Sequence, residues 1–232
     1  MAFKRTGGRK CKFESLETRR MFAGDVTAEV HGGTAEIEGD FFSNAVVITP
    51  GANPNEVVVT GVNDSNGLAT NVNGLPNGSI TLPGVIHGLE VKMGFGDDAV
   101  TMTNLTINGK SKVDMGEGVD SVTVTGSLFK SDLTIKTGRS MDTVTITNTT
   151  VRGTLQLKTG TGGDVVSLTG VNAGKLKVGL GEGNDVFTVA GTTVTTESIL
   201  NGDGGINPFT DAGSNFYGGF IHKKHLNGGW GG

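Results

Sequence analysis

The sequence predicts an all-β protein: a right-handed parallel β-helix with coils of about 22 residues. Three observations support this prediction. A short Gly/Asp motif recurs at nearly constant spacing, apolar residues alternate with polar ones around it, and glycine contributes 40 of the 232 residues. Glycine is therefore more than twice as frequent as the roughly 7% of ordinary soluble proteins, and this excess needs a structural reason.

The repeated motif is Gly-x-Gly-x-Asp or a degenerate form of it. It occurs in MGFGDDAVTMT, MGEGVDSVTVT, TGRSMDTVTIT, TGTGGDVVSLT and LGEGNDVFTVA, and in a sixth form, NGDGGINPFTD. The residue at the end of each motif, here called the anchor, is Asp98, Asp120, Asp142, Asp164, Asp185 and Asn207 in turn, with spacings of 22, 22, 22, 21 and 22 residues. A register this constant indicates a structural repeat.

Around each anchor the apolar residues alternate with polar ones, which is typical of a strand with one buried face. Inward pairs are expected two and four residues after the anchor, at Val100/Met102, Val122/Val124, Val144/Ile146, Val166/Leu168 and Phe187/Val189. A second strand is expected before the anchor, at Leu89/Val91, Ser111/Val113, Leu133/Ile135, Leu155/Leu157 and Leu176/Val178. A looser third apolar site follows at Leu105/Ile107, Leu128/Phe129, Val151, Val171 and Val194.

One such unit cannot bury its apolar side alone, so the units must stack, with rungs about 4.8 Å apart. The glycines then belong to corners that every coil repeats, where a positive φ is needed. The predicted organisation is a basic leader (1–25), irregular first coils (26–88), regular coils (89–215) and a Gly-rich C-terminal tail (216–232).

Composition and charge exclude several classes of protein. A single cysteine, Cys11, cannot form an intramolecular disulfide or a Cys-rich zinc module. No apolar run approaches the roughly 18 residues that a membrane-spanning helix needs. The net charge is −4, although residues 1–20 are strongly basic, so the rest of the chain is more acidic still. An acidic body repels phosphate, and nucleic acid is therefore not an expected partner.

The basic leader lacks the apolar core of an ordinary secretory signal. Residues 13–24, FESLETRRMFAG, resemble the LEPR-XLL motif found near the start of many bacterial extracellular and surface proteins. Thr18 stands where that motif usually has Pro, and Met21 and Phe22 stand where it has two Leu. This resemblance implies an extracellular or cell-surface location, with components of the cell envelope or extracellular matrix as partners.

Stacked anchors would place carboxylates about one rung apart, and such a column of like charges needs compensation. Hydrogen bonds from corner amides and bound hard cations both remain open. The repeats resemble those of RTX calcium-binding proteins, in which stacked Gly/Asp loops hold Ca²⁺. The resemblance is partial, because RTX repeats are nine residues long and Arg139 and Ser140 interrupt the pattern here. It implies Ca²⁺ ligands at Asp98, Asp120, Asp142, Asp164 and Asp185.

Outward positions form a second column at Thr101, Thr123, Thr145, Ser167 and Thr188, flanked by Thr103, Thr125, Thr147 and Thr169. A flat Thr-x-Thr face resembles the ice-binding face of some solenoid antifreeze proteins. Threonine is also simply favoured on exposed strands, and that is the preferred interpretation.

The sequence therefore predicts an exported, non-catalytic surface, matrix or adhesion module, with calcium as a candidate stabiliser. One alternative is a polysaccharide lyase or hydrolase, since such enzymes also use parallel β-helices, although fold is weak evidence for function. Ice binding is another alternative. His31 and His87 show no pattern of acids or nucleophiles around them in the sequence.

Overall fold

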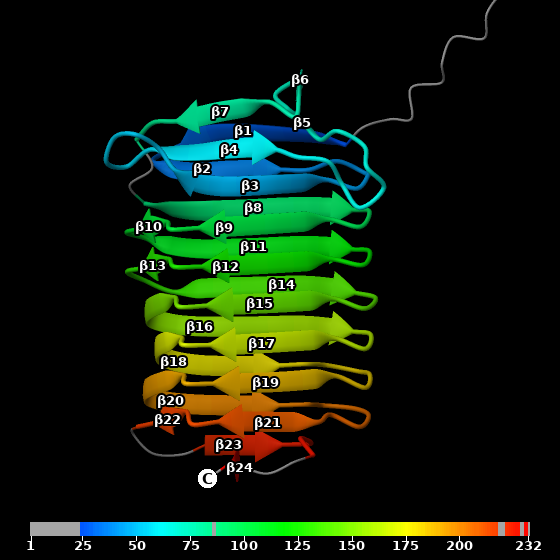
Figure 1. Cartoon of the computed structure of the whole chain (residues 1–232), viewed down its shortest axis with the longest axis vertical. Coiled ribbons are helices and arrows are strands. Elements are labelled where there is room, and N and C mark those ends of the chain that lie inside the picture. The colour runs from blue at the N-terminus through cyan, green and yellow to red at the C-terminus, as the bar shows by residue number, and fades with distance from the viewer. Residues whose placement is uncertain (1–23, 85–86, 218–220, 228–229, 232) are drawn as a thin grey trace, which may run out of the picture.

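The computed structural model describes residues 24–84, 87–217, 221–227 and 230–231, and it confirms a β-solenoid. In this part of the chain every helix or strand element is a strand, and the strands stack into one column (Figure 1). Two sheets form the walls of the column, one of fourteen strands and one of ten. The described residues include no helix suited to crossing a membrane.

The regular coils alternate between the two sheets. In the fourteen-stranded sheet they contribute β8 (Gly88–Phe95), β10 (Thr106–Ile107), β11 (Lys110–Glu117), β13 (Leu128–Phe129), β14 (Leu133–Arg139), β16 (Thr150–Thr161), β18 (Asn172–Gly179), β20 (Thr193–Asn201) and β22 (Asn215–Phe216). In the ten-stranded sheet they contribute β9 (Ala99–Thr103), β12 (Ser121–Thr125), β15 (Thr143–Thr147), β17 (Val165–Thr169), β19 (Val186–Ala190) and β21 (Phe209–Ala212).

The predicted register is confirmed. Val122 pairs in parallel with Val100 on one side and with Val144 on the other, and the alignment continues to Val166 and Phe187. Residues one coil apart are therefore vertical neighbours, and the inward pairs of all three predicted apolar sites line one continuous core. Leu128 is the exception among them, because it is only half-buried while its neighbour Phe129 is fully buried.

The N-terminal end differs from the prediction of irregular parallel coils over 26–88. β2 (Thr34–Glu38) and β3 (Ala45–Pro50) do form a coil in parallel register with β8 and β9. Antiparallel strands then cover this end: β1 (Asp25–His31) pairs with β2, β4 (Val57–Gly61) with β3, and β7 (Ser79–Leu82) with β4. A small hairpin of β5 (Asn71–Val72) and β6 (Leu75–Pro76) completes the covering layer. Alternation alone did not reveal this reversal, since it has the same period in both directions.

The C-terminal end carries the stack further than the sequence pattern suggests. Within the predicted tail, β23 (Ile221–Lys224) pairs in parallel with β20, and β24 (Trp230–Gly231) pairs in parallel with β21. Part of the tail is thus a further winding.

Candidate functional site

The five predicted calcium ligands lie in one column at the corner between the two sheets. Each directly precedes a strand of the ten-stranded sheet, and each is buried, with a relative exposure of 2% or less. We call these residues the Asp ladder: Asp98, Asp120, Asp142, Asp164 and Asp185. The stacking that the sequence predicted for these residues is confirmed.

One oxygen of each ladder carboxyl is bound to the neighbouring coil. Asp120 Oδ1 accepts the backbone N–H of Asp98 at 2.9 Å, and Asp142 Oδ1 accepts the N–H of Asp120 at 2.8 Å. The same bond joins every successive pair of anchors from Asn44 to Asn207. The donor is thus the anchor amide of the preceding coil rather than an amide of the same turn. This ladder of hydrogen bonds supports a corner-forming role for the aspartates.

The second oxygen of each ladder carboxyl has no such partner. The Oδ2 atoms of all five aspartates are buried and lack a hydrogen-bond partner in the described structure. Burial disfavours the charged form of a carboxyl group. Burial accordingly raises the pKa of Asp98 to about 8, of Asp120 to about 7 and of Asp142 and Asp185 to about 6. Burial also raises the pKa of Asp164.

The two ends of the column show which groups surround the second polar side-chain atom of an anchor residue. Asn207 occupies the last anchor position, and its Nδ2 donates to the carbonyls of Gly202 at 2.7 Å and Gly204 at 2.9 Å. Asn44 occupies the first, and its Nδ2 donates to the carbonyl of Phe42 at 2.6 Å and to Asp40 Oδ1 at 3.0 Å. At both ends this atom is a donor facing oxygen atoms, among them backbone carbonyls. A protonated Asp can supply a donor there, whereas a carboxylate cannot.

Calcium at the ladder stays a prediction. Among the described residues, the one group of three acids or histidines whose ligand atoms converge lies elsewhere, on β1 and β2. The neighbouring acids of the corner, Asp97 and Asp40, add negative charge near Asp120 and Asp98 respectively.

The predicted threonine column is confirmed as an outward feature of the ten-stranded sheet. Thr101, Thr123 and Thr145 are directly paired across β9, β12 and β15, and all three are half-buried. None of the outward side chains described on this sheet from β7 to β21 is charged. We call this surface the threonine face. Its regular coils display Ala99, Thr101, Thr103, Ser121, Thr123, Thr125, Thr143, Thr145, Thr147, Val165, Ser167, Thr169, Val186, Thr188 and Ala190.

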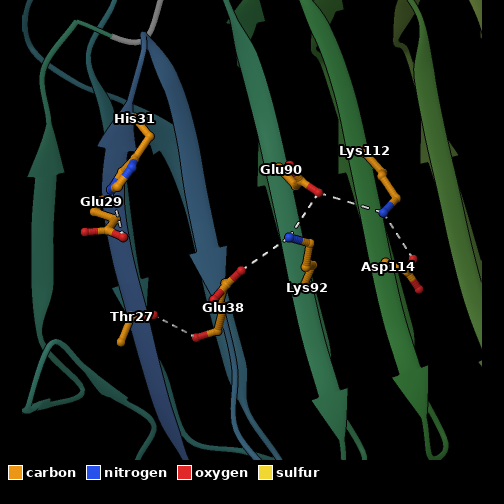
Figure 2. A network of polar contacts seen from close by, with 8 residues as sticks. All are labelled: Thr27, Glu29, His31, Glu38, Glu90, Lys92, Lys112 and Asp114. Atoms are coloured by element: carbon orange, nitrogen blue, oxygen red, sulfur yellow. Dashed lines mark hydrogen bonds and ion pairs between the residues drawn. The ribbon is translucent and has the colours of Figure 1, made fainter.

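The opposite face, on the fourteen-stranded sheet, is highly charged. Lys92 Nζ lies 3.3 Å from Glu38 Oε1 and 3.2 Å from Glu90 Oε1, and Lys112 Nζ lies 3.3 Å from Asp114 Oδ2 (Figure 2). Alternating charges thus run across the strands of consecutive coils. The side chains of these pairs are still partly exposed, so each pair adds little to stability.

A cluster of metal-ligating side chains that the sequence pattern did not reveal lies at the N-terminal end of the same charged face. Glu29, His31 and Glu36 offer ligand atoms that all lie within 4.8 Å of one another. Figure 2 shows Glu29 and His31 side by side on β1, with His31 Nε2 3.0 Å from Glu29 Oε1. His31 therefore does have acids around it. The available signal was the two-glycine turn after His31, which predicts a hairpin and brings Glu36 back opposite Glu29.

A depression of about 580 Å³ also lies on the charged face, lined by Glu90, Lys110, Lys112 and Asp132 among others. Its carboxylates are already engaged. Lys110 Nζ lies 3.7 Å from Asp132 Oδ2, and Asp132 Oδ1 accepts the N–H of Thr154 at 2.9 Å. Glu90 contacts Lys92 and Lys112. The residues fit a solvated network of ion pairs.

No protein-family model, curated protein or solved structure matches this chain.

Proposed function

We propose that this protein is an exported, non-catalytic β-solenoid that attaches through its threonine face to a neutral polymer of the cell envelope or extracellular matrix. The observation that carries the proposal is the separation of surface chemistry between the two sheets. The threonine face offers hydroxyl groups and aliphatic side chains, whereas the opposite face carries a network of ions. The basic residues 1–20 and the resemblance of residues 13–24 to the LEPR-XLL motif support export, and residues 1–23 lie outside the described ones.

The chemistry of the threonine face suits a regular, uncharged partner. A charged polymer would find no counter-charge among the outward side chains described from β7 to β21, so ion pairs with this face could not replace the water that such a polymer gives up. Threonine hydroxyls donate and accept hydrogen bonds, and their methyl groups bury apolar surface. Because parallel register repeats these groups at each rung, they form a lattice that matches a polymer with its own repeat. A neutral, hydroxyl-rich polysaccharide has this chemistry.

The expected result is binding of the full chain to insoluble neutral polysaccharide, measured by sedimentation of the protein with cellulose or chitin. The double variant Thr123→Lys/Thr145→Lys places charge at the centre of the threonine face and should lower binding at least about tenfold, a loss of about 1.4 kcal/mol. The matched control is Thr134→Lys/Gln156→Lys on the opposite face, where both residues are half-buried and outward. Equal binding by both double variants, or none by the unmodified chain, would contradict the proposal. Release of reducing sugar in the same samples would instead favour the enzyme alternative.

Ice is a second candidate partner, favoured by the direct pairing of Thr103, Thr125, Thr147 and Thr169 beside the central column. Two parallel threonine columns can order water. We expect thermal hysteresis from the unmodified chain under this hypothesis and its loss in Thr123→Tyr or Thr145→Tyr. An unmodified chain without hysteresis would remove ice from consideration while leaving polysaccharide binding intact.

A further inference from the structure

The hairpin at the N-terminal end of the solenoid brings together a histidine and two glutamates. β1 ends at His31 and β2 begins at Thr34, so only Gly32 and Gly33 form the turn. Both have positive φ, 54° and 80°, as a two-residue hairpin turn of the tight type requires. The turn fixes the pairing of Glu29 with Glu36. Strand alternation then places His31 on the same outward face as Glu29.

We propose that Glu29, His31 and Glu36 form a binding site for a divalent transition-metal ion of the Zn²⁺ class. Their three ligand atoms lie within 4.8 Å of one another. Around a tetrahedral zinc ion with bonds of roughly 2.1 Å, ligand atoms lie roughly 3.4 Å apart. His31 Nε2 and Glu29 Oε1 are 3.0 Å apart, so small rotations of exposed side chains suffice to admit the ion.

The charges around the cluster provide a second, independent argument. Glu29 lies directly opposite Glu36, and Glu36 lies directly opposite Glu90 on the next strand, β8. Like charges in such cross-strand positions are destabilising. Glu90 is compensated by Lys92 and Lys112, but among the described residues neither Glu29 nor Glu36 forms an ion pair with a lysine or arginine. A dication between them removes the repulsion that the fold leaves in place.

The donor set decides which cation fits. Calcium and magnesium take oxygen ligands, whereas one imidazole and two carboxylates suit zinc and its first-row neighbours. Three protein ligands leave at least one coordination position open to water, because the side chains of Glu29 and His31 are more than half exposed. The ion would join β1 to β2 at the end of the stack where antiparallel strands cover the regular coils. Glu29, through its hydrogen bond and charge, and Glu36, through its charge, raise the pKa of the His31 imidazole, which binds a metal ion in its neutral form.

The test is titration of the full chain with Zn²⁺ against a chromophoric chelator, followed by Co²⁺ absorption spectroscopy. We expect one equivalent of Zn²⁺ to bind, an increase in melting temperature on loading, and no competition from excess Ca²⁺ or Mg²⁺. Mutation of residues that only orient metal ligands typically lowers metal affinity by roughly 10–100-fold. His31→Gln and Glu36→Gln remove ligands themselves, so each should lower the affinity for Zn²⁺ by more than that. Both side chains are at the surface, so the variants should fold.

Two matched variants control for other sites. His87→Gln removes another histidine, and Glu38→Gln removes a carboxylate on the same strand, two residues beyond Glu36. Both should bind Zn²⁺ as the unmodified chain does. The proposal is overturned if no equivalent binds, or if His31→Gln binds as tightly as His87→Gln. Because the cluster and the threonine face lie on opposite sheets, either proposal can fail without the other.

Discussion

Lowering the pH from about 8 to about 4 is expected to raise the thermal stability of this protein, the reverse of ordinary acid denaturation. The reason lies in the Asp ladder: burial raises the pKa of Asp98 to about 8, of Asp120 to about 7 and of Asp142 and Asp185 to about 6, against 3.8 for an ordinary aspartate, and it raises the pKa of Asp164 as well. Between these values the folded state binds more protons than the unfolded state. Stability then falls as pH rises.

The pH range over which stability changes follows from the same pKa values. The stabilising contribution is complete below pH 3.8, the unfolded value, and is lost as the pH rises through about 6 and then about 8. One pKa unit corresponds to about 1.4 kcal/mol, so several shifted residues together change the free energy of unfolding by several kcal/mol. The ion pairs of the charged face are at least partly exposed, so each contributes about 1 kcal/mol at most. Because neighbouring anchors interact, their protons are lost as a coupled set.

Urea unfolding followed by circular dichroism at pH 5 and pH 8 provides the measurement. Asp142→Asn is the informative variant, since asparagine already occupies both ends of the column at Asn44 and Asn207. It should keep the acceptor for the N–H of Asp120 and reduce the pH dependence. Asp142→Ala removes that acceptor and should destabilise the protein at both pH values. Greater stability at pH 8 than at pH 5 in the unmodified chain would show that the ladder is ionised or occupied by a cation.

Gly138→Ala is expected to destabilise the solenoid by about 3 kcal/mol or more, combining steric overlap with backbone strain. Gly138 has φ +108°, and a Cβ atom there would lie 1.8 Å from the carbonyl oxygen of Gly116 in the preceding coil. That oxygen belongs to β11, which is held in parallel register by β8 on one side and β14 on the other, so it cannot move without displacing a rung. The excess of glycine in the sequence thus reflects close approach between coils as well as positive φ.

Two matched variants separate these causes. Gly67 also has positive φ, +77°, but a Cβ there meets nothing within 4 Å, so Gly67→Ala measures strain alone, about 1 kcal/mol. Gly179 has neither feature, and Gly179→Ala should be close to neutral. Melting temperature and urea midpoint order the three variants. If Gly138→Ala cost no more than Gly67→Ala, close packing of the corners would not be what requires glycine.

Some properties could be predicted from the sequence because each coil repeats them. The spacing from Asp98 to Asp120 and Asp142 predicts vertical neighbours, and the alternation around Val122 predicts which side chains are buried. Both are local patterns sampled several times, so a single irregular residue such as Ser140 does not obscure them. Burial of the anchors was not predicted. Their hydrogen bonds run between coils, and the unpartnered second oxygen becomes evident only once the corner is closed around it.

The sequence by itself determined the coil length, the stacking of the aspartates and the threonine column, because parallel stacking in register converts a constant spacing in the chain into a constant position in space. The tertiary structure alone decided the direction of β1, β4 and β7 and the meeting of Glu36 with Glu29 and His31. The physical reason is that a strand has the same two-residue period whichever way it runs. Its partner and direction depend on which edge is left unpaired at the end of the stack.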